Sequence, residues 1–470
     1  MLKSMKNCLL GVALVAAAFG TARSADLFIA TTAADFGTGS IAMLRAGANE
    51  AEINLLNIHS DTVVRYYDGI VYLVNRLGQD NILRLDPADP GTPLSQYSVG
   101  AGSNPQDIVV VSPDKAYVTL MERDYVLVLD PADGAELGRI DLSALADADG
   151  FPEAAEMVRV GDRVYVAIQR LDRDSFWAPV GDSYLAIIDI HTDEIVNPGS
   201  GDIPGFRLAS TNPGAMEAVG TQIVVQQVGN FTALDGGIEV IDTETLTSRG
   251  LLITEEQLGG NSGGLAMVSP TRGFTTVSSW PDNAIHPFDL ETGTVGEALE
   301  GHSGGYTPSL VVDGQRLIAA DRGTAEDLDA AGLLIYDAHT GTLLAGPINT
   351  GLPPNHMAVL SDDQVITAVT ESGAAQPRHT RLGDAYPNPF NTSTQIPFVV
   401  RDSSTSIRLE VYDVLGRRVR TLHDGPVAAG EHRLRWDGRN DAGQTVGNGV
   451  YMARLRTGAV TQTIKFMLIK

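Results

Sequence analysis

Two serines occupy a sequence pattern that can support nucleophilic catalysis. Ser262 and Ser303 each stand at the centre of a G-x-S-x-G pattern, written GNSGG and GHSGG in this chain. In a hydrolase nucleophile elbow this pattern joins a strand to a helix, and the sharp turn exposes the serine hydroxyl. No helical pattern follows either serine, and both align with Asn104-Pro105 and Asn212-Pro213 of an internal repeat. We therefore interpret them as turn residues and predict no catalytic residue, so a protein without enzymatic activity is favoured over an enzyme.

Two acidic stretches carry the ligand types that suit a divalent cation. Asp147-Ala148-Asp149-Gly150 and the run Glu326–Asp329 supply carboxylate oxygens, which Ca²⁺ prefers. Neither stretch has the alternating ligands and closing glutamate of an EF-hand loop. The nine histidines are scattered without the spacing of a zinc site. The sequence predicts solvated acidic loops with no metal and no cofactor, and Ca²⁺ is the alternative.

A strand that ends in aspartate recurs six times along the chain. The aspartates are Asp86, Asp130, Asp189, Asp242, Asp289 and Asp337, at spacings of 44, 59, 53, 47 and 48 residues. Such spacings are typical of propeller blades and not of helical solenoids. An aspartate in a hairpin turn can accept a backbone N–H bond from two residues further on. We therefore expect a structural role for all six.

Each repeat contains four stretches with the composition of β-strands. The strand that precedes an aspartate strand is exemplified by residues 69–75 and 115–121. A strand before that one is exemplified by residues 105–114, and the strand that follows the aspartate turn by residues 136–142. Seven units over residues 25–370, of about 49 residues each, predict an all-β, closed seven-bladed β-propeller, with six or eight blades as alternatives. Closure would pair an N-terminal strand with residues 354–360 or 364–370 and remove the free sheet edge.

One face of such a disc collects the loops between blades and the loops between the second and third strands of each blade. Arginines and aromatic residues are enriched at binding hot spots because they combine a large surface with hydrogen bonds or charge. We expect a ligand on this face, with residues 171–183 as the best single loop, although tryptophans there could equally cap the blades. The expected ligand contacts are Arg76, Arg123, Arg170, Phe176, Trp177, Phe231, Trp280, His302, Tyr306, Arg322 and His356.

Short motifs in the long region resemble the YVTN-repeat propellers of bacterial surface proteins. The motifs are Lys115–Thr119, the inter-blade Ser103-Asn104-Pro105 and the turn Asp130–Gly134. The resemblance implies the fold far more than an activity, because propellers have many unrelated functions. A binding protein without chemistry of its own is favoured, with a small molecule, a glycan or a protein as its ligand. The alternatives are a surface propeller that captures cobalamin, and a propeller lyase or lactonase that uses loop histidines and a divalent metal.

The N-terminal residues have the composition of an export signal. Lys3 and Lys6 precede the apolar run Cys8–Gly20, and Ala22 and Ser24 place small residues at the positions that a signal peptidase reads. This run of 13 residues is shorter than the roughly 20 that a transmembrane helix needs. We predict a signal peptide over residues 1–24 and no transmembrane segment in the mature chain. Its removal would leave no cysteine and therefore no disulfide.

Charge divides the chain into two modules. The 470 residues include 33 Lys and Arg against 58 Asp and Glu, a formal net charge of −25. Nucleic-acid binding is excluded as a nonspecific function, because it needs a basic face that displaces counterions from phosphates. Residues 25–383 carry 18 basic against 50 acidic side chains, whereas residues 384–470 carry 12 against 8. The change follows a polar stretch at residues 371–383, which we interpret as a linker.

The C-terminal module carries an ordered series of motifs. It opens with YPNPFN, continues with VYDVLGRRV, WDGRNDAG and GVYMARL, and ends in a lysine. Alternating strands with turns at Asp437-Gly438 and Asn448-Gly449 predict a small immunoglobulin-like β-sandwich of about 85 residues over 384–470. The residues of this series that we single out are Tyr386, Pro387, Asn388, Pro389, Phe390, Asn391, Gly449, Tyr451 and Lys470.

This series resembles the type A C-terminal sorting domain of type IX secretion, which is similar to the immunoglobulin-like fold of flagellar hook-capping proteins. One departure is Thr392, where the family usually has a second proline. The resemblance implies passage through the type IX translocon, followed by release or by attachment to the outer membrane surface. An ordinary adhesive sandwich is the alternative interpretation.

Overall fold

The computed structural model describes residues 25–175, 177–199, 203–279, 282–361, 381–382, 385, 390, 393–400, 405–413, 417–427, 430–457 and 461–468. The chain divides into two compact units, Met1–Val369 and Thr370–Lys470. The predicted signal peptide and most of the predicted linker lie outside the described residues. No helix among the described segments has both the length and the apolar character needed to cross a bilayer.

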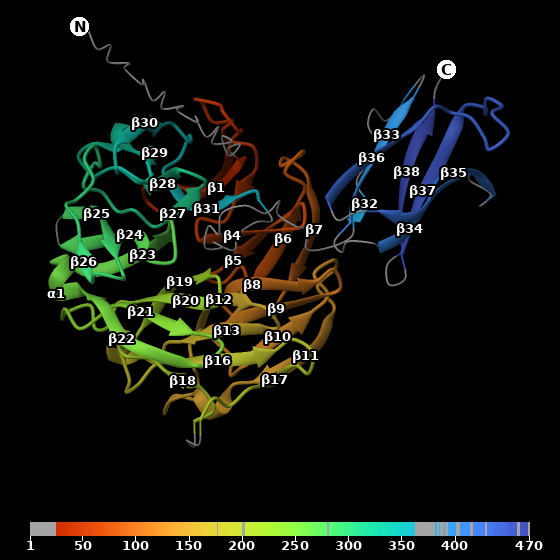
Figure 1. The fold of residues 1–470 in the computed structure, drawn as a ribbon. Helices are drawn as coiled ribbons and strands as arrows, with labels where there is room; N and C mark the ends of the chain where they lie inside the picture. The colour runs from red at the N-terminus through yellow and green to blue at the C-terminus, as the bar shows by residue number, and fades with distance from the viewer. Residues whose placement is uncertain are drawn as a thin grey trace, which may run out of the picture. The chain divides into compact units, whose positions relative to one another are not determined.

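The first unit is a ring of seven antiparallel sheets, drawn from red through green to cyan in Figure 1. From the innermost strand outward, blade 1 consists of β31 (Pro354–Val359), β1 (Leu27–Thr32), β2 (Gly39–Leu44) and β3 (Asn57–Ile58). Blade 2 consists of β4 (Thr62–Tyr67), β5 (Ile70–Asn75), β6 (Asn81–Leu85) and β7 (Pro93–Ser98). Blade 3 consists of β8 (Pro105–Ser112), β9 (Lys115–Leu120), β10 (Tyr125–Leu129) and β11 (Glu136–Asp141).

The other four blades keep the same strand order. Blade 4 consists of β12 (Ala154–Val160), β13 (Arg163–Ile168), β16 (Tyr184–Asp189) and β17 (Glu194–Ile195), with β18 (Phe206–Arg207) also paired to β16. Blade 5 consists of β19 (Pro213–Val219), β20 (Gln222–Gln227), β21 (Gly237–Asp242) and β22 (Thr247–Thr254). Blade 6 consists of β23 (Asn261–Met267), β24 (Arg272–Ser279), β25 (Asp282–Asp289) and β26 (Thr294–Val295). Blade 7 consists of β27 (Leu310–Asp313), β28 (Arg316–Asp321), β29 (Gly332–Asp337) and β30 (Leu343–Ile348).

The ring is closed by pairing between distant parts of the chain. Strand β1 pairs with β2 on one side and with β31 on the other, so that Leu27 lies opposite Val359 and Ile29 opposite Met357. The innermost strands β31, β4, β8, β12, β19, β23 and β27 contact one another in that order, and β27 contacts β31 again. The prediction of seven blades is confirmed, and residues 354–360 supply the closing strand.

Apolar layers between neighbouring blades hold the ring together. Tyr117 and Val128 of blade 3 pack with Val164 and Ile188 of blade 4, and every one of these side chains is buried. The middle strands are covered on both faces, which explains why they read as continuous apolar runs and not as alternating patterns. Burial contributes roughly 25 cal/mol for each Å² of apolar surface removed from water.

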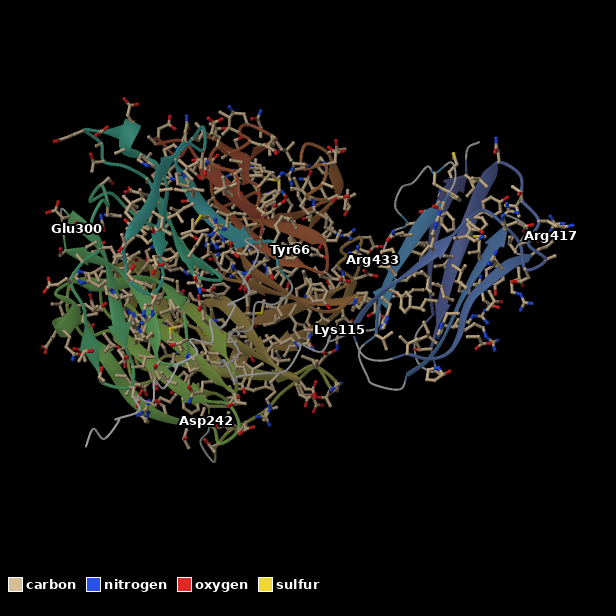
Figure 2. The ribbon with its side chains drawn as sticks, turned by 45° about the horizontal axis from the view of Figure 1, so that its top comes forward. Tyr66, Lys115, Asp242, Glu300, Arg417 and Arg433 are labelled. Atoms are coloured by element: carbon tan, nitrogen blue, oxygen red, sulfur yellow. The ribbon has the colours of Figure 1, made fainter. Side chains whose placement is uncertain are left out.

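The six aspartates hold the hairpins between third and fourth strands. Each carboxylate accepts the backbone N–H two residues on, at 2.8 Å in Asp86, Asp130 and Asp189, 2.9 Å in Asp289, and 3.0 Å in Asp242 and Asp337. Bonds from the backbone lower the pKa of Asp189, Asp242, Asp289 and Asp337. Figure 2 shows Asp242 at the periphery of the unit. The structural role predicted for this repeated residue agrees with these bonds.

The few helices and short strands of the first unit lie in its connections. They are the 3₁₀ turns η1 (Ser143–Leu145), η2 (Arg173–Ser175) and η3 (Leu328–Ala330), the helix α1 (Glu255–Leu258), and the strands β14 (Leu171–Asp172) and β15 (Ala178–Pro179). Helix α1 begins with a capping box between Thr254 and Gln257. The connections between blades therefore differ in length and form while the blades remain regular.

The second unit is a β-sandwich. One sheet contains β32 (Arg381–Leu382), β33 (Thr394–Val400) and β36 (Gly430–Trp436), and the other contains β35 (Arg418–Val427), β34 (Thr405–Asp413), β37 (Gly449–Arg456) and β38 (Thr461–Leu468). Trp436 is fully buried, with its ring centroid 4.9 Å from Tyr451 and 5.5 Å from Phe390. The indole N–H donates to the Arg439 carbonyl at 2.9 Å. Figure 2 labels Arg417 and Arg433 on this unit.

Candidate functional site

The loops between blades and the loops between second and third strands emerge at one end of the ring, which we call the loop face. This follows from the antiparallel order of each blade, because the innermost strand starts where the second strand ends. The loop 33–38 of blade 1 belongs to this face, since β1 and β2 are the second and third strands of the closed blade.

Arg322 is a buried cation on the loop face. It follows β28, and only 7% of its surface is exposed. Its Nη2 donates to the carbonyls of Thr32 and Ala33 at 3.3 Å each, while the buried Nη1 has no hydrogen-bond partner among the described residues. Within the described part of the chain it forms no ion pair, and burial lowers its pKa. The guanidinium carbon lies 4.8 Å from the centroid of the Phe36 ring, at cation–π distance.

Tyr306 lies beside this arginine, in the connection that leads into blade 7. Its carbonyl accepts the backbone N–H of Arg322 at 3.1 Å. The residue is 56% exposed, and burial raises the pKa of its hydroxyl. The charges of Arg76 and Arg322 oppose this rise in the tyrosine pKa. Tyr306 is therefore within electrostatic range of arginines from two blades.

Arg76 of blade 2 is held by its neighbours. Its Nε donates to Asp61 Oδ1 at 2.9 Å, and its Nη1 donates to Gln106 Oε1 at 3.1 Å. His356 of β31 accepts the N–H of Val64 through Nδ1 at 3.3 Å. Burial, together with the charges of Arg65 and Arg76, holds the pKa of His356 well below its usual value.

These interactions join residues of blades 7, 1 and 2 at the loop end of the innermost strands. We define this group as the mouth cluster: Phe36, Asp61, Arg76, Tyr306, Arg322 and His356. Four of its six members, Arg76, Tyr306, Arg322 and His356, are contacts that the sequence predicted, whereas Phe36 and Asp61 are additions from the structure. The aromatic rings are exposed at 57% for Phe36 and 56% for Tyr306, so the cluster presents two rings next to a buried charge.

Below the mouth, charged side chains connect the innermost strands. Arg65 donates to Asp107 and, through Nη2, to Glu156 Oε1 at 3.0 Å. Glu217 accepts the N–H of Met267 at 2.9 Å and has no cation bonded to it among the described residues. Burial raises the pKa of Glu156 to about 7 and that of Glu217 to about 8. Carboxyl groups with pKa values near neutrality therefore lie at the centre of the ring.

A second charged group lies on the loop face between blades 3 and 4. Arg173 of η2 forms ion pairs with Glu122, with Glu153 at 3.1 Å and with Asp149 at 3.6 Å. Its guanidinium carbon is 5.5 Å from the centroid of Trp177. Glu153 is fully buried, and burial raises its pKa to about 7. We call Glu122, Asp149, Glu153, Arg173 and Trp177 the Arg173 cluster.

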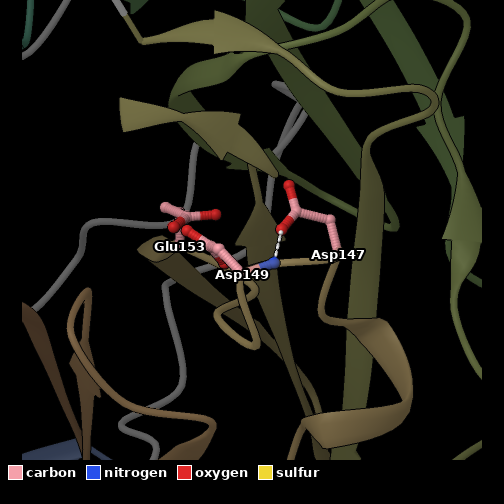
Figure 3. A group of neighbouring side chains, drawn as sticks. All are labelled: Asp147, Asp149 and Glu153. Carbon is pink, nitrogen blue, oxygen red and sulfur yellow. Dashed lines mark hydrogen bonds between the residues drawn. The ribbon is translucent and has the colours of Figure 1, made fainter. Parts of the chain in front are cut away.

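The acidic stretch 147–150, which could bind a cation, overlaps the Arg173 cluster. Carboxylate oxygens of Asp147, Asp149 and Glu153 lie within 4.8 Å of one another, as Figure 3 shows. Asp147 accepts the N–H of Asp149 at 3.1 Å, and Asp149 accepts the N–H of Phe151 at 2.8 Å. Arg173 already supplies positive charge to two of the three carboxylates. The stretch is therefore a hydrogen-bonded turn whose negative charge a single arginine compensates in part.

The remaining predicted contacts are spread around the ring. Arg123 donates to the carbonyls of Ala101, Gly102 and Glu122, and Arg170 donates to the carbonyl of Asp182. Phe231 is 60% exposed on blade 5.

His302 is placed inside the protein and not on its surface. Its side chain is 4% exposed, its Nε2 lies 2.6 Å from the Thr307 hydroxyl, and its Nδ1 accepts the N–H of Gly304 at 3.0 Å. Burial lowers its pKa. These bonds account for both ring nitrogens, so we do not include His302 in the mouth cluster. Two further predicted contacts, Phe176 and Trp280, lie outside the described residues, as do Tyr386–Pro389, Asn391 and Lys470.

Neither serine of the G-x-S-x-G patterns has a catalytic environment. Ser262 is the second residue of β23, and its hydroxyl lies 3.2 Å from Glu255. The Ser303 hydroxyl donates to Asp321 at 2.5 Å. No described histidine is bonded to either hydroxyl, and neither serine is followed by a helix. Ser303 lies in the connection before blade 7, as predicted, whereas Ser262 lies within strand β23 and not in a turn.

A surface groove lies elsewhere. It has a volume of about 660 Å³ and runs between blades 6 and 7, where it is lined by Arg272, Phe274, Pro287, Leu299, His339 and Leu343 among others. Thr340 of the Asp337 hairpin also lines it, and this hairpin belongs to the face opposite the loop face. None of the predicted contacts borders this groove.

Comparison with known proteins found one family match, in the second unit, and several similar solved structures. Residues 388–458 match the FlgD Ig-like domain family, and no curated protein matches the sequence. Structures similar to this chain include streptogramin B lyase, at 11% identity and a TM-score of 0.44, covering 64% of this chain and 92% of the lyase. The β-propeller domain of the Trilobed protease from Pyrococcus furiosus matches at 11% identity and a TM-score of 0.42, covering 67% and 93%. Kuenenia stuttgartiensis hydrazine synthase matches at 13% identity and a TM-score of 0.43, covering 70% and 99%.

Proposed function

We propose that this chain is an exported binding protein, a β-propeller that takes a ligand at the mouth cluster of its loop face and is delivered to the outer membrane surface or the medium by its C-terminal unit. Arg322 carries this proposal, because a buried cation without a counterion is costly and persists where a function requires it. Two exposed aromatic rings next to this cation provide the apolar area that binding sites use.

The mouth cluster is favoured over the Arg173 cluster by its charge balance. Arg173 is paired with three carboxylates, so its charge is satisfied within the protein. In the part of the chain that the structure describes, the Arg322 side chain bonds only to two carbonyl oxygens and contacts Phe36. Arg173 also has a buried nitrogen without a hydrogen bond, Nε, but its charge is already balanced by carboxylates, whereas the charge of Arg322 is available to a ligand.

Delivery rests on the predicted signal peptide and on the resemblance of the second unit to type A sorting domains. We propose the type IX translocon and its surface attachment machinery as the partners of this unit. The match of residues 388–458 to the FlgD Ig-like domain family is consistent with this proposal, because the two kinds of domain have similar folds.

Ligand binding is tested on the chain from residue 25 to 470. We would screen it on a glycan array and by thermal shift against small organic acids, and compare Phe36→Ala/Tyr306→Ala with Phe231→Ala. Phe231 is a matched control, since it is 60% exposed on the same face but lies on blade 5. The double variant should lose the hits while the control keeps them. Hits that survive the double variant would place the binding site elsewhere.

Delivery is tested in a bacterium with type IX secretion. A chain that ends at residue 383 should accumulate as a folded propeller inside the cell envelope, while the full chain reaches the surface or the medium. Equal appearance of both chains outside the cell would contradict the sorting role.

A further inference from the structure

The arginines near the loop face differ in how their charge is compensated. Arg65 is paired with Asp107 and Glu156, Arg76 with Asp61, and Arg173 with three carboxylates. Arg123 has no carboxylate partner, but its two terminal nitrogens donate to three carbonyl oxygens. Arg322 combines burial, absence of a described ion pair and an unused buried donor at Nη1. Arg170 also has no described ion pair and has a buried Nε without a hydrogen bond, but its side chain is only partly buried. Arg322 is therefore the most buried of the described loop-face arginines whose charge a bound group could complete.

The missing partner of a guanidinium is an oxyanion. Planar arginine donors match carboxylate, sulfate and phosphate oxygens, and charge-assisted bonds of this kind are about twice as strong as neutral ones. The charge of Arg76 also acts on Tyr306 and His356, and its partner Asp61 offsets part of it at Tyr306. The chain as a whole carries a net charge of −25, which repels anions from most of the surface. A local excess of arginine charge is thus a specific feature of the mouth cluster.

The exposed aromatic rings of the mouth cluster indicate the character of the rest of the ligand. Phe36 covers the guanidinium with one face at 4.8 Å, and Tyr306 presents a ring that is 56% exposed. Aromatic side chains of this kind offer flat apolar surfaces to the faces of rings. Nη1 is covered by the protein, so direct contact between a ligand and this nitrogen requires a neighbouring side chain to move aside.

We propose that the mouth cluster recognises an acidic glycan, a sugar ring bearing a carboxylate or sulfate group that pairs with Arg322 while the ring packs on Phe36 and Tyr306. This inference rests on the proposed ligand-binding function and specifies its ligand class. The two candidate ligands, a uronate and a sulfated sugar, share an oxyanion carried on a sugar ring.

The test uses the chain 25–470 and three immobilised polymers: polygalacturonic acid for carboxylate, dextran sulfate for sulfate and plain dextran as the neutral probe. We expect one acidic polymer to bind and dextran not to bind. Arg322→Gln should weaken binding at least about tenfold, the effect of losing one charge-assisted pair. Arg123→Gln, which removes a loop-face arginine bonded only to carbonyls, should leave it unchanged. Added salt should weaken binding by the wild-type protein.

The outcomes separate this inference from the proposed function. If Phe36→Ala/Tyr306→Ala abolishes binding while Arg322→Gln binds as tightly as wild type, the binding site stands and the anionic ligand class is wrong. An equal loss of affinity in Arg322→Gln and Arg123→Gln would also overturn the proposal of an acidic ligand, and so would binding that is insensitive to salt. Arg322→Lys keeps the charge and serves as the second variant if Arg322→Gln does not fold. Failure of both acidic polymers to bind contradicts the inference even if the array finds a neutral ligand.

Discussion

Arg65 and Asp107 form a two-bond ion pair between the innermost strands of blades 2 and 3. Arg65 Nε lies 2.7 Å from Asp107 Oδ1, and Nη2 lies 3.0 Å from Oδ2. Asp107 is almost fully buried, and its Oδ2 also accepts the N–H of Met157 in blade 4 at 2.8 Å. One arginine and one aspartate therefore connect three consecutive blades at the centre of the ring.

Loss of Arg65 should destabilise the propeller strongly. Arg65→Met leaves the Asp107 carboxylate buried without its cation, and removing one partner of such a pair costs about 3 kcal/mol. Denaturant unfolding monitored by circular dichroism measures the change. Arg139→Met is the control, because Arg139 pairs with Glu136 on the exposed edge of blade 3, and surface pairs contribute little. Equal effects of the two substitutions would contradict a central role for this pair.

Glu217 should make the propeller less stable at alkaline pH. Burial raises its pKa to about 8, so the folded state holds a proton that the unfolded state releases near pH 4.5. The favourable contribution of the protonated form is complete below pH 4.5 and is lost as the pH rises to about 8. Glu217→Gln keeps an acceptor for the Met267 N–H and removes the titration.

We expect Glu217→Gln to have an unfolding free energy about 2 kcal/mol higher than that of wild type at pH 9. This value is smaller than the full pKa shift would give, because the Glu217 side chain keeps partial contact with solvent. At pH 4 the two proteins should be nearly equally stable. Thermal unfolding across this pH range gives the comparison, and parallel curves for the two proteins would show that Glu217 does not titrate as stated.

The architecture was largely predictable because it repeats. The spacing of Asp86 to Asp337 sets the blade length, and the aspartate turn is local, since its bonds span two residues. The closing strand was also predicted as one of two segments. Phe36 was missed because the turn of the first unit lacks the aspartate, and residues 33–38 become a second-to-third-strand loop only once β31 has paired with β1.

The charged centre could not be predicted from local patterns. Arg65 is 42 residues from Asp107 and 91 from Glu156, so their contact depends on the ring. Sequence reasoning selected arginines by loop position, could not distinguish the paired Arg76 from Arg322, and did not select Arg173. A signal for Arg173 existed, since it lies in the long loop 171–183 near the acidic stretch 147–150. What decides its role is ion pairing with Glu122, which lies 51 residues earlier.

The aspartate turns should respond differently to alanine and to asparagine. Asp242→Ala removes the acceptor of the Glu244 and Thr245 N–H groups and should lower the melting temperature by on the order of 2 °C. Asp242→Asn keeps an acceptor oxygen and should behave closer to wild type at neutral pH. Because these bonds lower the pKa of Asp242, its contribution is present above the unfolded pKa and is lost as the pH falls. Identical melting of both variants would contradict the hydrogen-bond role.

Arg173 should be required for stability only where its carboxylate partners are ionised. Arg173→Met leaves Glu122, Asp149 and Glu153 without their shared cation, and the fully buried Glu153 should suffer most. At pH 8 we expect a loss of about 3 kcal/mol in unfolding free energy.

At pH 5 this loss should shrink by more than half, since the pKa of Glu153 is about 7 and removal of the arginine raises it further. The proton then replaces the cation as the means of neutralising the buried carboxylate. Glu153→Gln/Arg173→Met provides the matched double variant, because it has no buried charge at either pH and should be more stable at pH 8 than Arg173→Met alone. A loss in Arg173→Met that is the same at pH 5 and pH 8, and that Glu153→Gln does not relieve, would mean that Arg173 acts through packing on Phe151 and Trp177 and not through charge.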